Sequence, residues 1–173
     1  MTRGRFGKDL MFSYDIQALA RRVVEEGAAR GLTAACAESC TGGLVAAAIT
    51  AVPGSSTVLD RGFVTYSNAA KTQMLAVSAA MIEAHGAVSE AVARAMAEGA
   101  LRHSGARVSV AVTGIAGPGG GSQDKPVGLV HFAAAGPAGV IHVAHRFGDI
   151  GREAVRLESV RTALGLLLDR IGA

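Results

Sequence analysis

A serine followed by a cysteine, a threonine and two glycines lies between an apolar run and an alanine-rich run, in Glu38-Ser39-Cys40-Thr41-Gly42-Gly43. We expect a strand to end before this motif and a helix to begin after it, so that the N–H groups from Cys40 to Gly43 point into one small volume. Such a turn binds anions, and it can also stabilise the oxyanion of an acyl-transfer reaction. Position alone favours Ser39 as an N-cap, but its hydroxyl can also serve as a nucleophile, with the thiol of Cys40 as a rival.

A nucleophilic serine needs a base, and Lys71 is a candidate because it follows a predicted strand end at Tyr66-Ser67-Asn68. A desolvated lysine loses its proton near neutral pH and can act as a general base, and Tyr66 could share its site. A single lysine on a short helix is nevertheless more often a solvated surface charge. A Ser-His-Asp triad stays open, but none of the five histidines follows a predicted strand end, where α/β active sites collect. These histidines are His85, His103, His131, His142 and His145.

A glycine-rich loop over residues 113–122 begins at the end of a third apolar run, beginning with Thr113 and Gly114. Ligands bind at strand ends in open α/β sheets, and successive N–H groups can form an anion nest. The loop lacks the Gly-Lys-Ser/Thr ending of a P-loop, and it does not open a helix as a dinucleotide fingerprint does. Arg152 and Arg156, in the first turns of the last predicted helix, could clamp a phosphate. No carboxylate cluster has the spacing of metal ligands, so no metal is expected.

The composition limits the kind of protein. The chain has 173 residues, of which 50% are hydrophobic and 18% charged, so we expect one folded domain. A net charge of +3 and an aromatic content of 4% without tryptophan argue against nucleic acid as a partner. No run reaches the roughly 18 apolar residues of a membrane span, so no membrane is expected. Cys36 and Cys40 form neither a disulfide framework nor a zinc motif, which favours a reduced, cytoplasmic protein.

Helical and strand patterns alternate along the chain. Helices are predicted over residues 16–30, 44–51, 69–75 and 152–170, with two more capped by Ser78 and Ser89. Strands are predicted over residues 32–37, 58–67, 107–112, 127–135 and 139–147, the last two joined by a hairpin at Gly136-Pro137. The order predicts a three-layer α/β/α sandwich with a mixed, mostly parallel sheet. We expect residues 14–173 to form the single domain and residues 1–13 a disordered leader, with Met11 as an alternative start.

Six runs of residues, in this order, are specific enough to compare with known families. They are Ala37-Glu38-Ser39-Cys40-Thr41-Gly42-Gly43, Gly54-Ser55-Ser56, Gly62-Phe63-Val64-Thr65-Tyr66-Ser67-Asn68 with Lys71, Gly86-Ala87-Val88-Ser89, Thr113-Gly114-Ile115-Ala116-Gly117-Pro118-Gly119-Gly120, and Lys125-Pro126-Val127-Gly128. Together they resemble the C-terminal domain family of the competence/damage-inducible protein CinA. The resemblance extends from about Ile16 to the end of the chain.

The resemblance implies an activity, because members of this family include nicotinamide mononucleotide (NMN) amidohydrolases. These enzymes convert NMN to nicotinic acid mononucleotide and ammonia in pyridine-nucleotide salvage, and they act without a cofactor. The family also implies a three-layer α/β/α fold and a homo-oligomer, with a dimer favoured here.

The resemblance also implies roles for individual residues. Ser39 would form the acyl intermediate, and Lys71 with Tyr66 would handle the proton. The turn amides of Cys40, Thr41, Gly42 and Gly43 would hold the oxyanion, while Thr113 and Gly114 line the substrate pocket. Arg152 would hold the 5′-phosphate. In the family the last helix is entered by Gly-Asp-Arg, whereas this chain reads Gly148-Asp149-Ile150-Gly151-Arg152, which makes Arg156 the alternative phosphate ligand.

Two other functions compete with the deamidase. One is a non-catalytic module that binds pyridine nucleotides in a competence or DNA-damage response, using the same anion-binding loops. The other is an enzyme that forms a Schiff base on Lys71. The joint presence of Ser39, Tyr66 and Lys71 favours the amidohydrolase, because a binding module needs no such trio.

Overall fold

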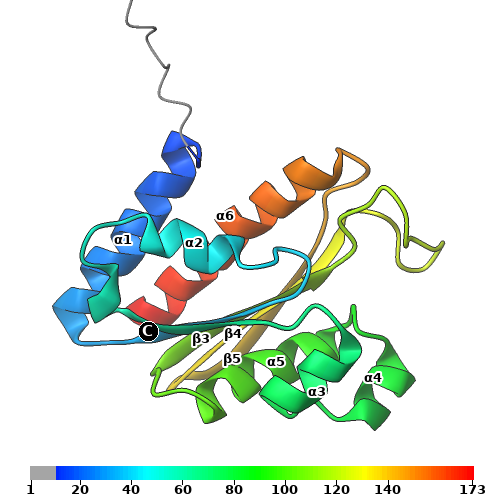
Figure 1. The fold of residues 1–173 in the computed structure, drawn as a ribbon, viewed down its shortest axis with the longest axis horizontal. Coiled ribbons are helices and arrows are strands. Elements are labelled where there is room, and N and C mark those ends of the chain that lie inside the picture. The colour runs from blue at the N-terminus through cyan, green and yellow to red at the C-terminus, as the bar shows by residue number, and fades with distance from the viewer. Residues whose placement is uncertain (1–10) are drawn as a thin grey trace, which may run out of the picture.

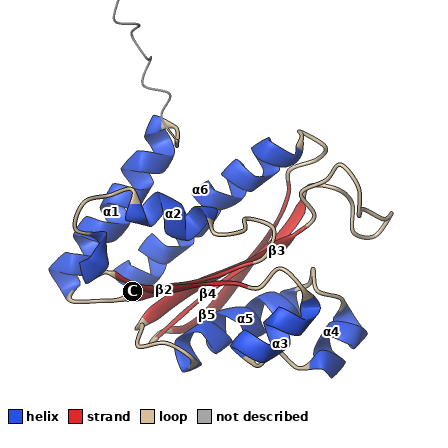
Figure 2. Cartoon of the chain, in the orientation of Figure 1, coloured by secondary structure: helices blue, strands red, loops and turns tan. Residues whose placement is uncertain are grey.

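The computed structural model describes residues 11–173 and arranges them in three layers around one sheet (Figures 1 and 2). The predicted α/β/α class is therefore confirmed. The strands are β1 (Ala34–Glu38), β2 (Leu59–Val64), β3 (Val108–Gly114), β4 (Leu129–Gly136) and β5 (Gly139–Arg146). On one face lie α1 (Tyr14–Arg30), α2 (Leu44–Thr50) and α6 (Arg152–Gly172), and on the other α3 (Asn68–Leu75), α4 (Ala79–His85) and α5 (Glu90–Arg102). A short 3₁₀ helix, η1 (Ser55–Thr57), precedes β2.

The first residues of the described chain are tied to the domain. Of the leader predicted over residues 1–13, residues 1–10 lie outside the described part. Phe12 is buried with 3% of its surface exposed, and its carbonyl accepts a hydrogen bond from the side chain of Gln17. No helix among residues 11–173 has the length and hydropathy needed to cross a lipid bilayer.

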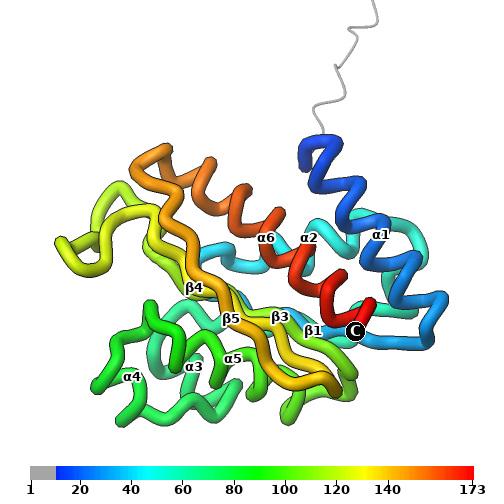
Figure 3. The backbone as a smooth tube through the Cα atoms, turned by 180° about the vertical axis from the view of Figure 1, so that it is seen from behind, coloured from blue at the N-terminus to red at the C-terminus, as the bar shows by residue number. Residues whose placement is uncertain are grey.

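The sheet has the strand order β2-β1-β3-β4-β5, with β5 at one edge (Figure 3). β1 pairs with β2 and β3 in parallel, whereas β4 pairs with β3 and β5 in antiparallel. The expectation of a mostly parallel sheet is thus corrected, because the pairings divide equally. The cause is the way these strands are connected. The glycine-rich loop joins β3 to β4 without a crossover helix, and the β4–β5 hairpin turns after Gly136 as predicted, so each strand runs opposite to the one before it.

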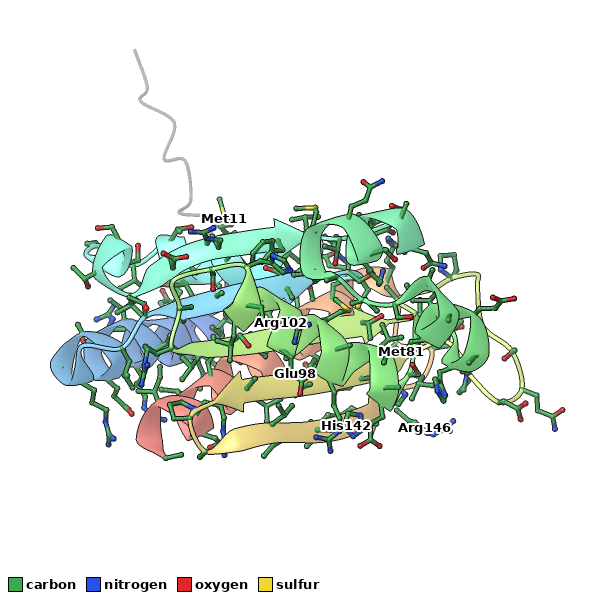
Figure 4. The ribbon with its side chains drawn as sticks, turned by 90° about the horizontal axis from the view of Figure 1, so that it is seen from below. Met11, Met81, Glu98, Arg102, His142 and Arg146 are labelled. Carbon is green, nitrogen blue, oxygen red and sulfur yellow. The ribbon has the colours of Figure 1, made fainter. Side chains whose placement is uncertain are left out.

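The central strands are buried on both faces, so successive side chains enter different cores. In β1, Cys36 packs into the core beneath α1, α2 and α6, whereas Ala35 and Ala37 pack into the core beneath α5. The outer face of α5 is polar, and an ion pair at 4.0 Å joins Glu98 to Arg102 one turn later (Figure 4). The sheet is therefore held rigidly between two helical layers, which fixes the positions of its strand ends.

The helix starts on the far face are set by serine caps. Ser67, Ser78 and Ser89 each accept a hydrogen bond from a backbone N–H in the first turn, at the beginning of α3, α4 and α5. The caps predicted at Ser78 and Ser89 are confirmed. The Ser67 cap fixes where α3 begins after β2, and thereby sets the position of Lys71 in that helix.

The chain leaves β1 toward β2 on one side and later returns to β3 on the other side. Ligands of open α/β sheets bind at such a switch point, outside the carboxyl ends of the two diverging strands. Ser39 follows β1 directly, and its N–H donates to the carbonyl of Val112 in β3 at 2.9 Å. Thr65, which follows β2, donates its N–H to the carbonyl of Glu38 at 2.8 Å. The ends of three parallel strands are thereby brought together.

Candidate active site

The hydroxyl of Ser39 and the amine of Lys71 meet at the carboxyl edge of the sheet, 32 residues apart in sequence. The Nζ–Oγ distance is 3.0 Å, and both groups are buried, with 8% of Ser39 and 1% of Lys71 exposed. The turn after β1 supplies the hydroxyl, and α3 supplies the amine from the far face of the sheet. The fold therefore brings the Ser39 hydroxyl and the Lys71 amine to hydrogen-bond distance, as a nucleophile and its base require.

Lys71 is one of the largest fully buried side chains, rather than the solvated charge that a lysine on a short helix usually is. Its amine donates to the carbonyls of Thr65 at 2.9 Å and Tyr66 at 3.4 Å. Among residues 11–173, no carboxylate forms an ion pair with it. Burial without a counter-ion lowers the pKa of Lys71 below its ordinary value of 10.5.

The contacts of Lys71 also orient the neutral amine. A neutral amine has two N–H donors and one lone pair. When the carbonyls of Thr65 and Tyr66 accept the two donors, the lone pair is left facing the third neighbour, the hydroxyl of Ser39. This arrangement allows the serine proton to pass to Lys71 without rotation of the side chain.

Glu38 is the residue of the turn motif that the sequence analysis did not assign to the site. Its carboxylate is buried and accepts the N–H groups of Gly43 at 3.0 Å, Val45 at 3.1 Å and Ala46 at 2.9 Å. The first N–H groups of α2, which normally lack partners, are thereby satisfied by a side chain of the protein itself. The N-terminus of α2 is therefore already occupied by an anion, and the N–H of Gly43 is not free for a ligand.

The remaining N–H groups of the turn are used differently. Gly42, with a left-handed φ of 58°, donates its N–H to the carbonyl of Ser39 at 3.0 Å. Within residues 11–173, the N–H groups of Cys40 and Thr41 have no backbone or side-chain oxygen acceptor. These two amides, rather than all four of the predicted set, are available to an oxygen held beside Ser39.

The thiol of Cys40 is buried and close to the carboxylate of Glu38. Burial is the larger cause, and it raises the pKa of Cys40 to about 12, which keeps the thiol protonated. A thiol is a weak nucleophile compared with its thiolate. Of the two candidates left open by the sequence, Ser39 is therefore the one with a base in contact.

Two arginines of α6 reach toward the site and contact different parts of it. Arg152 is exposed and donates to the phenol oxygen of Tyr66 and the carbonyl of Gly117, each at 2.9 Å. Arg156, one turn later, is half-buried and donates to the carbonyls of Cys40 at 3.1 Å and Thr41 at 3.2 Å. The two extra residues before Arg152 thus do not remove it from the site, and Arg156 is engaged by the turn.

A cavity of about 280 Å³ opens beside the Ser39–Lys71 pair. Most of the predicted site residues line it, namely Ser39, Cys40, Tyr66, Lys71, Thr113, Gly114 and Arg152, whereas Thr41, Gly42 and Gly43 do not. The other lining residues are Asn68, Ala87, Val88, Ile115, Ala116, Gly117, Gly119 and Gly120. The glycine-rich loop therefore forms part of the wall of the cavity, together with the serine turn.

Thr113 and Gly114 contribute to this wall through their packing. The hydroxyl of Thr113 donates to the carbonyl of Ala87 at 2.8 Å and so holds the segment before α5 against β3. A Cβ on Gly114 would lie 2.6 Å from a methyl of Val130 in β4, so only glycine allows the two strands to pair closely here. Both residues shape the cavity without using a free polar group.

The phenol of Tyr66 bonds Arg152, and only the backbone carbonyl of Tyr66 contacts Lys71. Sequence reasoning placed Tyr66 and Lys71 in one site, which the shared cavity agrees with, but it could not tell which group of Tyr66 faces the lysine. It also left out Thr65, whose carbonyl orients Lys71. The signal for Thr65 was its position at the end of β2, directly beside the end of β1.

Comparison with known proteins gives a consistent assignment. The family described as the CinA C-terminal domain matches residues 16–171. The crystal structure of the competence/damage inducible protein CihA from Agrobacterium tumefaciens is 53% identical, covers 95% of this chain and 99% of its own, and has a TM-score of 0.92.

Two curated relatives differ in length. A CinA-like protein from Anaeromyxobacter sp. (strain K) is 53% identical over 165 residues, which is 95% of this chain but only 40% of that protein. The nicotinamide-nucleotide amidohydrolase PncC of Enterobacter agglomerans is 55% identical over 148 residues, which is 82% of this chain and 90% of that protein. The chain thus spans about two fifths of the CinA-like relative and most of the shorter one. The match along nearly its whole length shows that the chain belongs to the CinA C-terminal domain family.

Proposed function

We propose that this chain is a serine amidohydrolase that hydrolyses the carboxamide of NMN to nicotinic acid mononucleotide and ammonia. The observation that carries the proposal is the 3.0 Å contact between Ser39 and a buried lysine without a counter-ion. The name of the relative from Enterobacter agglomerans, a nicotinamide-nucleotide amidohydrolase, supports the choice of substrate. Fold alone would not, because one fold carries many activities.

The first half of the reaction forms an acyl-enzyme. Lys71, in its neutral form, takes the hydroxyl proton of Ser39 as Oγ attacks the carboxamide carbon. The carbonyl π electrons move to the oxygen, and the N–H of Cys40, with that of Thr41 beside it, stabilises the resulting oxyanion. Lys71 then gives its proton to the leaving nitrogen, the carbon–nitrogen bond breaks, and ammonia departs.

The second half returns the enzyme to its starting state. Lys71 takes a proton from a water molecule as the water oxygen attacks the ester carbon of the acyl-enzyme. The bond to Ser39 Oγ breaks, Lys71 returns the proton to Oγ, and nicotinic acid mononucleotide is released. Lys71 is thus base and acid in turn, which suits an amine whose pKa lies below its ordinary value.

The phosphate end of the nucleotide is assigned to the part of the cavity that Arg152 lines. Apart from Lys71, Arg152 is the basic residue in the lining of the cavity. Its guanidinium donates hydrogen bonds to the phenol oxygen of Tyr66 and the carbonyl of Gly117. Arginine binds phosphate oxygens through two parallel N–H donors. We assign the 5′-phosphate to Arg152, with Tyr66 holding the guanidinium in place.

The test is ammonia release from NMN by the purified protein in the presence of EDTA, compared with Ser39→Ala and with the exposed control Ser56→Ala. We expect turnover in the wild type and in Ser56→Ala, and loss of turnover to the background rate in a folded Ser39→Ala variant. kcat/KM should rise with pH as Lys71 loses its proton, with a midpoint below 10.5. Saturable NMN binding without ammonia release would instead support the nucleotide-binding module.

The cytoplasmic location and the homo-oligomer, with a dimer favoured, remain part of the proposal. Cys36 and Cys40 are both free and buried, which fits a reducing compartment. Light scattering on a size-exclusion column measures the assembly directly, and a monomer at all concentrations would remove that part of the proposal.

A further inference from the structure

The side chain of Arg156 reaches from α6 to the serine turn, more than 110 positions earlier in the chain. Its Nε donates to the carbonyl of Cys40 at 3.1 Å, and its Nη2 donates to the carbonyl of Thr41 at 3.2 Å. Two neighbouring donors of one planar guanidinium thus hold two successive carbonyls. A lysine, with a single point of charge, cannot reproduce this forked contact.

Holding a carbonyl fixes the amide on the other side of the same peptide plane, because a trans peptide is planar and its C=O and N–H point in opposite directions. The carbonyl of Cys40 shares its plane with the N–H of Thr41. The carbonyl of Thr41 shares its plane with the N–H of Gly42. Arg156 therefore contacts the planes of both N–H groups directly.

The third plane of the turn is held through the second. The N–H of Gly42, fixed by the contact of Arg156 with Thr41, donates to the carbonyl of Ser39 at 3.0 Å. The carbonyl of Ser39 shares its plane with the N–H of Cys40. All three peptide planes after Ser39, including the two with unpaired N–H groups, are thus linked to the guanidinium of Arg156. The N–H of Leu44 also donates to the carbonyl of Thr41, at 3.1 Å, and supports the second plane.

We infer that Arg156 is a positioning residue that aims the oxyanion-binding amides of Cys40 and Thr41, and that it does not bind the phosphate of the substrate. The inference rests on the proposed acyl-transfer reaction. Arg156 does not line the cavity beside Ser39, whereas Arg152 does. Arg152 is exposed beside the cavity, whereas Arg156 is half-buried against the carbonyls of the turn, so α6 offers one arginine to the substrate and one to the turn.

The test compares Arg156→Ala and Arg156→Lys with Arg161→Ala. Arg161 is the matched control, because it lies on the same helix and pairs with Asp15 and Glu158 away from the site. We expect kcat for NMN to fall about 10- to 100-fold in both Arg156 variants, with KM changed less than threefold, because misaimed oxyanion donors weaken transition-state binding. Arg161→Ala should keep kcat. Guanidinium at millimolar concentration should restore part of the rate of Arg156→Ala, and ammonium should not.

Hydrogen exchange of the peptide that contains residues 38–43 separates this inference from the proposed function, because it does not need turnover. The N–H of Gly42 donates to the carbonyl of Ser39, so it reports whether the turn keeps its geometry. Faster exchange at Gly42 in Arg156→Ala than in Arg161→Ala supports the positioning role even if the wild type releases no ammonia. Unchanged exchange would overturn the inference, whatever the activity. If the wild type is active, a rise in KM with unchanged kcat in the Arg156 variants would also overturn the inference. It would indicate that Arg156 binds the phosphate of the substrate.

Discussion

The guanidinium of Arg152 donates a hydrogen bond to the phenol oxygen of Tyr66 at 2.9 Å and joins the start of α6 to the segment between β2 and α3. These residues are 86 positions apart in sequence and line the same cavity. The contact places a cation on the wall where we assign the phosphate of the substrate. It also gives the largely exposed phenol ring a defined position.

Replacing Arg152 by alanine should weaken binding of the phosphate and leave the chemical step nearly intact. Hydrogen bonds to charged groups contribute about 1.5–3 kcal/mol, so we expect KM for NMN to rise about 10- to 100-fold. Turnover of the nucleoside that lacks the phosphate should change little. Tyr66→Phe removes only the hydrogen bond to Arg152 and should raise KM by less. An equal loss of kcat/KM for NMN and for the nucleoside in Arg152→Ala would contradict the assignment of the phosphate to Arg152.

Replacing Lys71 by methionine should abolish turnover and stabilise the fold. Methionine fills similar space without a charge, and burying a charge that has no counter-ion destabilises the folded state. Because burial lowers the pKa of Lys71 in the native state, the unfolded chain binds more protons between that pKa and 10.5, and wild-type stability rises with pH there. The advantage of the variant should therefore be greatest at or below the native pKa of Lys71 and shrink toward pH 10.5.

Urea unfolding at several pH values measures this effect, with Lys125→Met as the control because Lys125 lies at a half-exposed loop position. A Lys71→Met variant that is less stable than the wild type at neutral pH would mean that the amine is a net stabilising group. The assignment of Lys71 as a neutral base would then lose its physical ground.

Replacing Glu38 by glutamine should destabilise the turn and α2. The carboxylate accepts three N–H groups with two oxygens, whereas an amide offers one acceptor oxygen and turns its own N–H donors toward the helix end. We expect a loss of about 1–3 kcal/mol in the free energy of unfolding, measured in urea. The exposed Glu83→Gln in α4 is the control, and equal stability of the two variants would contradict the capping role.

The local fold could be predicted from the sequence because local signals agree with it. The apolar run before Ser39 and the alanine-rich run after it predict the β1–α2 turn, and the serines at 78 and 89 do cap helices. The direction of β4 was harder, because a hairpin signal says that two strands pair in antiparallel but not beside which strand the pair lies. β4 pairs with β3 in antiparallel orientation, so the sheet does not have the majority of parallel strand pairs that alternating helices and strands suggest.

The site could be predicted only as a set of residues. Serine, lysine and tyrosine could be chosen by type and position, but the burial of Lys71 depends on where α3 lies beside the turn after β1, which no local pattern encodes. Glu38 was missed because an acid at a strand end has no distinguishing local signal. Arg156 was named as the alternative phosphate ligand because its partners are carbonyls far away in the sequence, and only the tertiary structure shows them.

Because Glu38 already fills the positive end of α2, the serine turn contains its own internal counter-charge. A substrate that arrives there does not have to supply a negative group to complete the helix terminus, and the reacting carboxamide is itself uncharged. The turn is thus preorganised in the empty protein. The charged end of a ligand is left to the exposed guanidinium of Arg152, whose contacts with Tyr66 and Gly117 do not involve the nucleophile.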